Sequence, residues 1–487
     1  MIYKLPWETP LAHPSSLLFS QLHQTQLIMS PISNSDSLPN VFQDFISEHP
    51  NIKFTLPGEP EWAGITKCFI RTSNSPSIVA RPQDASQIQD LIRHCVLHNV
   101  DFVVRSGGHD CTGRSQVRGA LTIDMRDIQY INIAEDKRTA RIGGGIITRE
   151  LTKALDTEGL ITPTAPNASI GYVGWATLGG YGPLSNKYGL GVDQIVGAKY
   201  VNAEGALINA AEEELMAIRG GGACLGVITE MTIKVYSLKE ILEGTFVFGS
   251  CNKEQAWTSF VERYNKLTAS EDIPTRLSLQ LTGVAIPNIG NIFNVSCLWA
   301  DDDHDEGRRW MDRIADLGTC IKEVVKPNTW PAHCEEKEKL AGYGVYGRAR
   351  TLNLKALTPK TIEILAKYNE SIPGPGSLFS MQFHHDPVQP LDSVFAPRCD
   401  HYWLEIIATS REEGGAETAD QWALGLQREL VEYDPENILD PAYVGFVDDG
   451  EMDLKKGFGD RYKILMATKQ KFDPKNVFKN TTPRLLY

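Results

Sequence analysis

The sequence predicts an α+β protein with more than one folded unit. Three observations support this class: a length of 487 residues, a composition with 42% hydrophobic and 22% charged residues, and short strand-like apolar runs that alternate with stretches of helical spacing. A single core of this size would be unusual, so we expect two domains, or one domain built around an insertion. The net charge of -13 argues against a nucleic-acid-binding protein. A bound dinucleotide remains compatible with it, because backbone N–H groups can neutralise a diphosphate.

The first 50 residues are rich in Pro, Ser and Gln, and we expect them to be poorly ordered. Pro6 and Pro10 interrupt the opening segment, so no signal peptide is predicted, which favours the cytoplasm; Met29 is an alternative start. No run of about 18 apolar residues predicts a membrane span. The nine cysteines form no C-x-x-C pair, so we expect neither a disulfide framework nor a zinc site.

The pattern sharpens from residue 76. Asp84 and Gln87 form a pattern like a capping box, and the apolar positions from Ile88 to Val96 recur at helical spacing. Short strands are expected at 101–104, 120–125 and 140–142, a helix at 148–156, and a half-buried strand at 227–235. Glu204 and Gly205 predict a hairpin between 199–202 and 206–209.

The character of the chain changes beyond residue 240. An amphipathic helix is expected from Ala256 to Tyr264, then strands at about 276–284 and 292–299 and a helix near 305–316. Strand–helix alternation continues to about 430, and residues 457–478 are predicted to form a last helix. The order of these expected elements indicates an N-terminal nucleotide-binding domain, a second α+β domain and a C-terminal segment that returns to the first domain.

The hexapeptide Arg105-Ser106-Gly107-Gly108-His109-Asp110 is the strongest local signal, because it follows directly on a predicted strand. Two glycines let a backbone turn tightly and approach a ligand, and successive N–H groups can form an anion site. A histidine on such a loop would lie against whatever the loop holds. On this segment alone, a surface turn with an ordinary histidine is an equal alternative.

A second signal is the segment from Gly171 to Gly182, with five glycines in twelve residues. It indicates a backbone pressed against a flat ligand or a diphosphate. The alternative is a glycine-rich loop with no ligand, which is weakened by further runs at Gly143-Gly144-Gly145 and Gly220-Gly221-Gly222. No strand–GxGxxG–helix unit followed by an acidic residue is present, so a Rossmann domain is not predicted.

Taken together, these residues resemble the PCMH-type FAD-binding module of the vanillyl-alcohol-oxidase superfamily, and most closely the fungal berberine-bridge-enzyme-like oxidoreductases. The resemblance runs from about 74 to 238 and resumes at about 440 to 480. The pieces stand in the family's order: Val79-Ala80-Arg81-Pro82, the Arg105–His109 loop, Leu121-Thr122-Ile123-Asp124-Met125, Gly179-Gly180-Tyr181-Gly182, Gly222-x-x-x-Gly226-Val227-Ile228-Thr229, Tyr462-x-x-Leu465 and Phe472-Asp473-Pro474-x-Asn476-Val477-Phe478.

The resemblance implies a two-subdomain FAD-binding domain at 74–238. It also implies a substrate domain at 239–440, with an antiparallel sheet covered by helices, and a segment at 441–487 that completes the FAD domain. The implied activity is a two-electron oxidation of a small, secondary-metabolite-like substrate by hydride transfer to flavin, with O₂ as the acceptor. The implied partners are therefore a small molecule and O₂, with no nucleic acid and no membrane.

In the family, the histidine of this loop is bonded to the C8α methyl of FAD, and here that residue is His109. The second, cysteinyl bond of some members falls on Asn167, and no cysteine lies between Cys111 and Cys224, so a single link is expected. The resemblance implies cofactor-binding roles for Arg105, Ser106, Gly107, Gly108, His109, Asp110, Gly171, Gly174, Thr177, Gly179, Gly180, Gly182, Gly226, Val227 and Asn476.

The substrate side is expected to supply a base that accepts a proton while hydride leaves for the flavin. Tyr346, His401 and Glu405 are the catalytic candidates, with Tyr343, Arg348, His384, His385 and Tyr402 considered beside them. A structural role is the alternative for each. Strand alternation puts His401, Trp403 and Glu405 on one face and Tyr402 on the other. Adjacent His384 and His385 would point to opposite faces of a strand, so no metal site is expected.

Two alternatives to an oxidoreductase remain at this point. The first is a flavin-dependent cyclase that guides ring closure without net redox change. The second is a flavin-free binding or structural protein, which would purify colourless. Reduction of the flavin by substrate distinguishes the oxidoreductase from both.

Overall fold

The computed structural model describes residues 38–249, 253–340, 342–385, 390–440, 442–451 and 453–485. Most of the segment expected to be poorly ordered, including Met29, lies outside these residues. Its last part forms helix α1 (Leu38–Glu48), so the expectation of weak order is wrong there. Phe42 and Phe45 of α1 are buried in a core with Ile88 of the next long helix. This apolar burial stabilises α1 although the first 50 residues are rich in Pro, Ser and Gln.

A four-stranded sheet follows α1 and positions the His109 loop. The strand order is β1 (Lys53–Thr55), β2 (Ile78–Arg81), β4 (Leu121–Asp124) and β3 (Phe102–Arg105), with short helix α2 (Trp62–Ile65) between β1 and β2 in sequence. Strands β2 and β3 both run parallel to β4. Helix α3 (Ala85–Leu97) begins after Asp84, whose side chain accepts the Gln87 N–H at 2.9 Å, as the capping pattern predicts. Strand β3 leads directly into the loop at Ser106.

A five-stranded antiparallel sheet comes next. Its strands, in spatial order, are β5 (Ile131–Ile133), β6 (Thr139–Gly143), β10 (Val227–Lys234), β8 (Ile195–Val201) and β9 (Leu207–Asn209), while β7 (Leu160–Ile161) and β11 (Tyr236–Ser237) pair separately. The hairpin predicted around Glu204 and Gly205 is present, with Val201 opposite Leu207. The helices here are α4 (Thr148–Asp156), α5 (Tyr172–Thr177), α6 (Ser185–Tyr188), α7 (Gly191–Gln194) and α8 (Glu212–Gly221).

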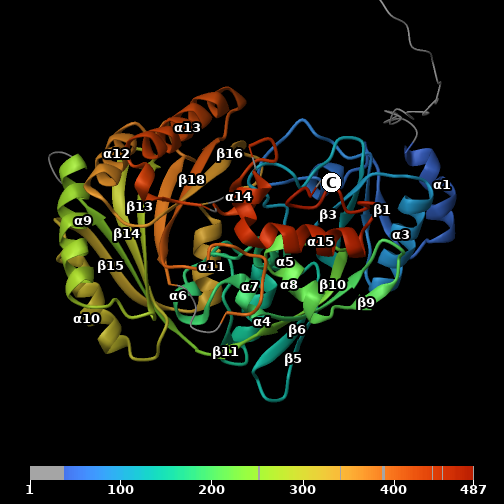
Figure 1. Ribbon diagram of the computed structural model, residues 1–487, viewed down its shortest axis with the longest axis horizontal. Coiled ribbons are helices and arrows are strands. Elements are labelled where there is room, and N and C mark those ends of the chain that lie inside the picture. The colour runs from blue at the N-terminus through green and yellow to red at the C-terminus, as the bar shows by residue number, and fades with distance from the viewer. Residues whose placement is uncertain are drawn as a thin grey trace, which may run out of the picture. The chain divides into compact units, whose positions relative to one another are not determined.

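An eight-stranded antiparallel sheet dominates the second half of the chain (Figure 1). Its order is β15 (Cys320–Asn328), β12 (Ile241–Phe248), β14 (Gly290–Trp299), β13 (Leu277–Ile286), β17 (Leu378–His384), β18 (His401–Ser410), β16 (Tyr346–Leu354) and β19 (Ile438–Leu439). The long helices α9 (Lys253–Ser270), α10 (His304–Ala315), α12 (Pro359–Glu370) and α13 (Ala416–Tyr433) cover it, and α11 (Trp330–Glu338) precedes β16. The α+β class is confirmed.

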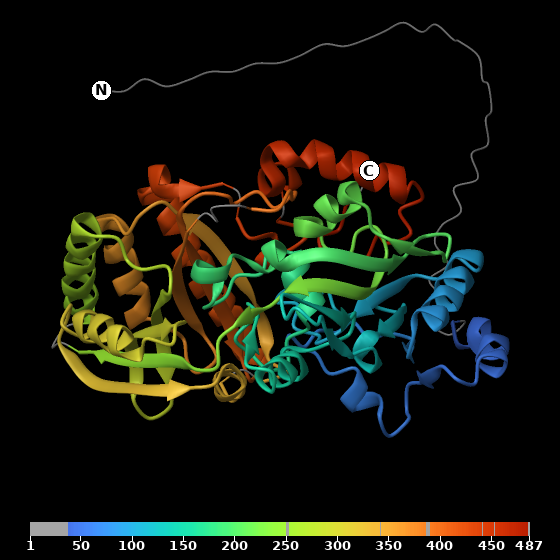
Figure 2. The ribbon, with the colours of Figure 1, turned by 90° about the horizontal axis from the view of Figure 1, so that it is seen from below.

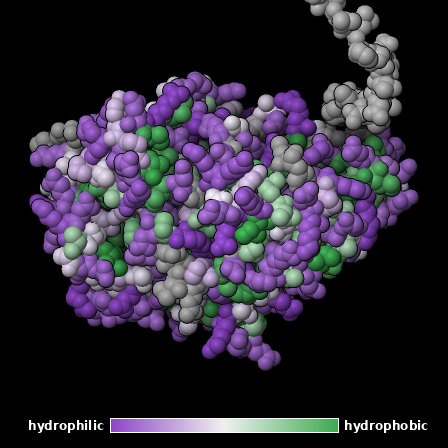
Figure 3. All heavy atoms as spheres, in the orientation of Figure 1, coloured by the Kyte–Doolittle hydropathy of each residue, from purple (hydrophilic) through white to green (hydrophobic). Residues whose placement is uncertain are grey.

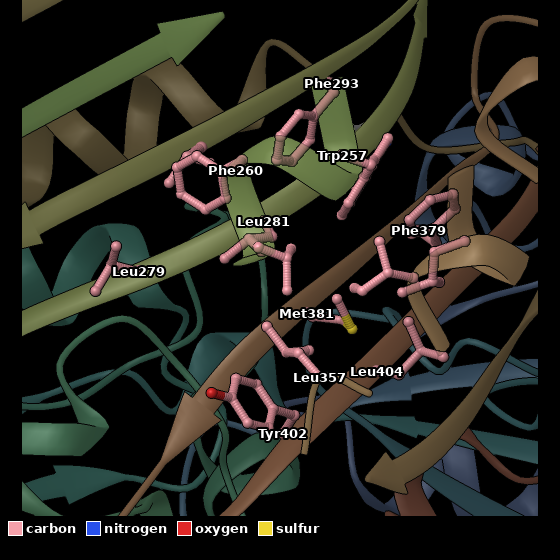
Figure 4. Close-up of a cluster of buried hydrophobic side chains, with 14 of the residues drawn as sticks. Trp257, Phe260, Leu279, Leu281, Phe293, Leu357, Phe379, Met381, Tyr402 and Leu404 are labelled. Carbon is pink, nitrogen blue, oxygen red and sulfur yellow. The ribbon is translucent and has the colours of Figure 1, made fainter. Parts of the chain in front are cut away.

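Alternation along the strands gives this sheet one apolar and one polar face. Leu277, Leu279 and Leu281 of β13 belong to the largest hydrophobic core, with Trp257 of α9 and Trp422 of α13. Figure 4 shows Leu281, Met381 and Leu404 from adjacent strands gathered in this core. The intervening residues Ser278, Gln280 and Thr282 face a cavity instead. The helices therefore stabilise the sheet from one side and leave a polar face on the other.

The C-terminal segment returns to the first half of the chain (Figure 2). It forms α14 (Leu454–Phe458), a 3₁₀ turn and α15 (Tyr462–Phe472), so the predicted single helix over 457–478 is wrong in extent. Gly459, with φ of 50°, breaks the helical path, and Pro474 cannot continue α15. Leu465 of α15 is buried in one core with Ala217 and Ile218 of α8.

The surface is largely hydrophilic on the face shown in Figure 3. Across the residues that the structure describes, we find no helix with the length and apolar character that a bilayer span requires.

Candidate functional site

A cavity of about 1360 Å³ lies between the loops of the first half of the chain and the polar face of the eight-stranded sheet. Small-molecule sites usually occupy about 300–1,000 Å³, so this cavity has room for a large cofactor and a substrate together. One wall is built by Val103–Cys111, which includes the His109 loop, and by residues between Ala165 and Pro183. The opposite wall includes Gln280, Gln382 and Glu405 of the sheet.

The backbone of the His109 loop is pressed against the segment before α5. A Cβ atom on Gly107 would lie 2.4 Å from both the Gly171 nitrogen and the Ser169 carbonyl oxygen, so only glycine fits there. Gly108 has φ of 71°, in the left-handed region that glycine tolerates. These two positions explain why the sequence has paired glycines directly before His109.

The same loop presents free backbone donors to the cavity. Among the described residues, no acceptor takes the N–H groups of Gly107, Gly108 or His109. Buried backbone N–H groups normally have partners, and a run of unpaired ones on a turn is a site for a polar or anionic group. The loop therefore fits a flavin cofactor with its diphosphate and polar ring edge.

His109 lines the cavity and is held on three sides. Its Nε2 lies 2.6 Å from Ser169 Oγ, and its ring stacks on Phe69 with centroids 5.5 Å apart. Tyr343 packs on it with a centroid distance of 4.7 Å. Burial, with a smaller contribution from the Arg105 charge, lowers the pKa of His109 to about 3. The imidazole is therefore neutral at physiological pH, and one ring nitrogen keeps its lone pair.

Asp110 connects this loop to the C-terminal segment through Arg114. The Asp110 carboxylate accepts from Arg114 Nε at 3.0 Å, and Arg114 also donates to the carbonyl oxygens of Gly445 and Val447, both at 3.0 Å. Burial would raise the pKa of Asp110, but the Arg114 charge and hydrogen bonds hold it below its ordinary value. Arg114 was not singled out from the sequence, although it is the residue that joins the two segments.

The structure brings most of the predicted cofactor residues to the cavity wall. Those that line it are Arg105, Ser106, Gly107, Gly108, His109, Asp110, Gly171, Gly174, Thr177 and Gly182. Trp175 also lines it and donates from Nε1 to the Tyr181 carbonyl oxygen at 3.0 Å.

The remaining predicted cofactor residues do not line the cavity; they are Gly179, Gly180, Gly226, Val227 and Asn476. Cβ atoms on the three glycines would collide with the Phe395 ring, the Gly191 backbone and the Val201 carbonyl oxygen, at 2.3–2.5 Å. Val227 is part of a hydrophobic core, and Asn476 donates to the Leu485 carbonyl oxygen at 3.0 Å. These residues allow close packing of the scaffold behind the site.

Glu405 is the predicted catalytic candidate that faces the cavity. It accepts a hydrogen bond of 2.9 Å from Ser380 Oγ. Burial raises the pKa of Glu405 to about 7, although the Ser380 hydrogen bond acts in the opposite direction. Trp403 shares this face of β18, while Tyr402 packs into the core behind the sheet, as the strand alternation predicts. A carboxyl group that titrates near neutrality is suited to proton transfer.

The structure does not bring the other two catalytic candidates to the cavity. His401 lies behind Tyr181, whose hydroxyl oxygen is 2.7 Å from His401 Nε2, and His401 Nδ1 lies 2.7 Å from the Cys399 carbonyl oxygen. The ring of Tyr346 faces the Arg71 guanidinium at 5.4 Å. Neither residue lines the cavity, and His401 contacts Tyr181, which does. Of the residues considered beside them, Tyr343 alone lines the cavity; Arg348, His384, His385 and Tyr402 do not.

Sequence reasoning missed Ser169 and Glu338. Ser169 donates to the Glu338 carboxylate, at 2.7 Å to Oε1 and 2.8 Å to Oε2, while its oxygen lies beside His109. The two residues are separated by 169 positions in the sequence, and neither belongs to a motif. Glycine-rich flanking sequence signals that the segment before α5 is a loop, but nothing in it points to an acidic partner on α11.

Comparison with known proteins shows the family. The FAD binding domain matches residues 76–211, and the berberine and berberine-like family matches residues 442–483. The FAD-linked oxidoreductase aurO of Gibberella zeae is 30% identical over 440 residues, covering 88% of this chain and 85% of that protein. This chain belongs to the berberine-bridge-enzyme-like FAD-linked oxidoreductases.

Two further similar proteins are named as hydroxynicotine oxidases. (R)-6-hydroxynicotine oxidase of Paenarthrobacter nicotinovorans is 34% identical over 199 residues, which are 39% of this chain and 43% of that enzyme. The solved structure of 6-hydroxy-D-nicotine oxidase from Arthrobacter nicotinovorans has the same fold, with a TM-score of 0.77 and 22% identity over 89% of this chain and 97% of that one.

The fold is also shared with glucooligosaccharide oxidase from Acremonium strictum, with a TM-score of 0.74 and 18% identity over 89% of this chain and 97% of that one. The FAD of that enzyme is described as 6-S-cysteinyl, 8α-N1-histidyl. In this oxidoreductase, Asn167 lines the cavity and donates from Nδ2 to the Lys337 carbonyl oxygen at 3.2 Å.

Proposed function

We propose that this FAD-linked oxidoreductase carries its FAD on one covalent bond to His109. We also propose that it oxidises a small organic molecule by hydride transfer to the flavin, with O₂ as the acceptor. The observation that carries the proposal is the arrangement of two groups on opposite walls of one cavity. A neutral imidazole stands on the glycine loop, and a carboxyl group with a pKa near 7 stands on the sheet.

The single link is supported by the environment of His109 and by the residue at 167. When bound, FAD supplies a ring that accepts a hydride, and a covalent bond to it prevents loss of the cofactor and raises its redox potential. His109 would hold this ring against the Gly107–Gly108 backbone. Asn167 cannot form the thioether that a cysteine supplies, and its amide is used in a hydrogen bond to the protein.

Glu405 is the residue that would take the substrate proton. Its carboxylate form accepts a proton from an O–H, N–H or C–H bond of the substrate as the hydride departs. A base with a pKa near the working pH combines a useful ionised fraction with a strong drive to accept a proton. Ser380 keeps Glu405 oriented, because its hydroxyl donates to one carboxylate oxygen and leaves the other for the substrate.

The sheet supports the proposal that the second half of the chain, at 239–440, receives the substrate. Its cavity face carries hydroxyl and amide groups from Ser278, Gln280, Thr282, Asn294 and Ser296, while Trp403 and Ile407 contribute apolar surface. Such a wall suits an oxygenated small molecule of the secondary-metabolite type, with hydrogen-bonding groups on an apolar framework. The segments 74–238 and 441–487 would hold the cofactor.

Anaerobic mixing with candidate substrates tests this function. Polycyclic, alkaloid and polyketide compounds are screened by the loss of flavin absorbance, followed by hydrogen peroxide release when air is admitted. Bleaching and peroxide release with one class are expected. If substrate is converted without loss of flavin absorbance, the protein is a flavin-dependent cyclase and the proposed oxidation is wrong. If the purified protein is colourless, it has a function that does not use flavin.

A further inference from the structure

Resting on the covalent link proposed above, we infer that Glu338 is a positioning residue for that link. Acting through Ser169, it directs FAD to Nδ1 of His109 and assists formation of the bond. The three side chains form one chain of hydrogen bonds, Glu338–Ser169–His109, which we call the attachment relay.

The direction of the relay follows from the donor at Ser169. Its hydroxyl donates to Glu338 at 2.7 Å from Oε1 and 2.8 Å from Oε2, and its backbone N–H donates to Oε2 at 3.1 Å. A serine hydroxyl has one proton, and a carboxylate can only accept. Ser169 Oγ therefore offers a lone pair to the His109 Nε2 that lies 2.6 Å away.

This direction fixes the tautomer of His109. Nε2 must carry the proton that it donates to Ser169, so Nδ1 keeps the lone pair that can attack a carbon atom. Among the described residues, no group forms a hydrogen bond with Nδ1. Phe69 and Tyr343 hold the ring plane, so the free nitrogen has a fixed direction.

The attachment relay also accounts for the proton that His109 must lose when the covalent bond forms. As Nδ1 bonds to the C8α methyl carbon, that carbon loses one proton, and the electron pair of the broken C–H bond passes to the flavin. The imidazole becomes cationic until Nε2 releases its proton toward Ser169 and Glu338. Dioxygen takes the two electrons and the two protons as hydrogen peroxide, which restores oxidised FAD. The Glu338 carboxylate thus stabilises the charge that develops on His109.

Glu338 differs in its surroundings from the other acidic residues of α11. Glu335 pairs with Arg149 at 2.7 Å and Glu336 pairs with Lys326 at 2.8 Å. Within the described parts of the chain, Glu338 has no basic side chain at ion-pair distance, and its side-chain hydrogen bonds are those from Ser169. The Glu338 carboxylate therefore accepts its side-chain hydrogen bonds from Ser169, the residue that contacts His109.

The test compares covalent attachment in full-length variants. Apoprotein is made under riboflavin limitation and mixed with FAD in air, and the flavin retained after acid denaturation is followed with time. Glu338→Gln is nearly isosteric, but its amide can donate to Ser169 and reverse the relay. We expect it to slow attachment at least about tenfold, with non-covalent FAD binding retained, as for other residues that orient a reacting ligand. Ser169→Ala should have the same effect, and the double variant should be no slower than either single variant.

Three controls separate this role from a general loss of structure. Glu335→Gln on the same helix should attach FAD at the wild-type rate. Glu338→Asp and Ser169→Thr keep the carboxylate and the hydroxyl, and should retain much of the attachment rate lost in Glu338→Gln and Ser169→Ala. Wild-type attachment in Glu338→Gln would overturn the relay while leaving the proposed function intact. Absence of covalent FAD in the wild type would instead overturn the proposed link itself.

Discussion

Ser380 donates a hydrogen bond of 2.9 Å to Glu405, its cross-strand partner in the β17–β18 ladder. Two opposing effects meet at this pair. Burial raises the pKa of Glu405 to about 7, whereas the Ser380 hydroxyl favours the ionised form and lowers it. The proton affinity of the proposed base is therefore set by how far the cavity excludes water and by one hydroxyl group.

Replacement of Glu405 by glutamine removes the base and keeps its shape. We expect Glu405→Gln to lower the rate of flavin reduction by about 10²–10⁴-fold, the usual contribution of general acid–base catalysis. In the wild type, the rate should rise with pH through an inflection near the pKa of about 7, because only the carboxylate accepts a proton. Anaerobic stopped-flow absorbance across pH 5–9 measures both. A pH-independent wild-type rate would assign the proton to another group.

Removal of the Ser380 hydroxyl should shift that profile without abolishing activity. Without this donor the ionised form of Glu405 is less stable, so the pKa of Glu405 rises further. Ser380→Ala should therefore move the inflection to higher pH and leave the high-pH plateau near the wild-type value. An inflection that stays in place, or moves to lower pH, would contradict the assignment.

The raised pKa of Glu405 also predicts a cost in stability. A carboxyl group with a higher pKa in the folded state than in the unfolded state destabilises the fold when it ionises. The cost is absent below the ordinary pKa of 4.5, grows as the pH rises and is complete above about 7. Glu405→Gln should therefore raise the free energy of unfolding by up to about 3 kcal/mol at pH 8 and by little at pH 4.5. Thermal unfolding at the two pH values measures this, and equal effects at both would exclude an ionisation cost.

Gly107 provides a test of the close backbone contact at the loop. In Gly107→Ala the new Cβ would lie 2.4 Å from two backbone atoms of the facing segment, so the loop must move away from Gly171. We expect loss of covalent FAD and a lower melting temperature. Gly64→Ala is the matched control, because a Cβ there meets nothing within 4 Å and helix α2 favours alanine. Unchanged FAD content in Gly107→Ala would show that the loop does not need this contact.

Local patterns were enough to predict which loop residues line the cavity. Gly107 and Gly108 are required by the backbone itself, so the sequence displays the constraint directly. The alternation on β18 likewise placed Glu405 and Trp403 on the cavity face, because side-chain direction in a strand depends only on position. The Asp84 cap of α3 could also be predicted, because Asp84 and Gln87 lie within one helical turn of each other.

Local sequence patterns could not predict contacts between residues that are far apart in the sequence. His401 lies on the same side of β18 as Glu405 but is covered by Tyr181, which is 220 positions earlier in the sequence. Tyr346 is turned toward Arg71, and no motif records that contact. Asn476 resembles a cofactor ligand in sequence, yet it supports the chain near Leu485. Each correction arises from tertiary packing between segments that the linear pattern does not connect.

Mass spectrometry of the tryptic peptide Ser106–Arg114 tests the central claim most directly. We predict that this peptide carries the mass of one FAD less the two hydrogen atoms lost on bonding, with fragmentation placing the adduct on His109. The His109→Ala protein should release all of its flavin on denaturation. An unmodified peptide from yellow, fully FAD-loaded wild-type protein would contradict the account.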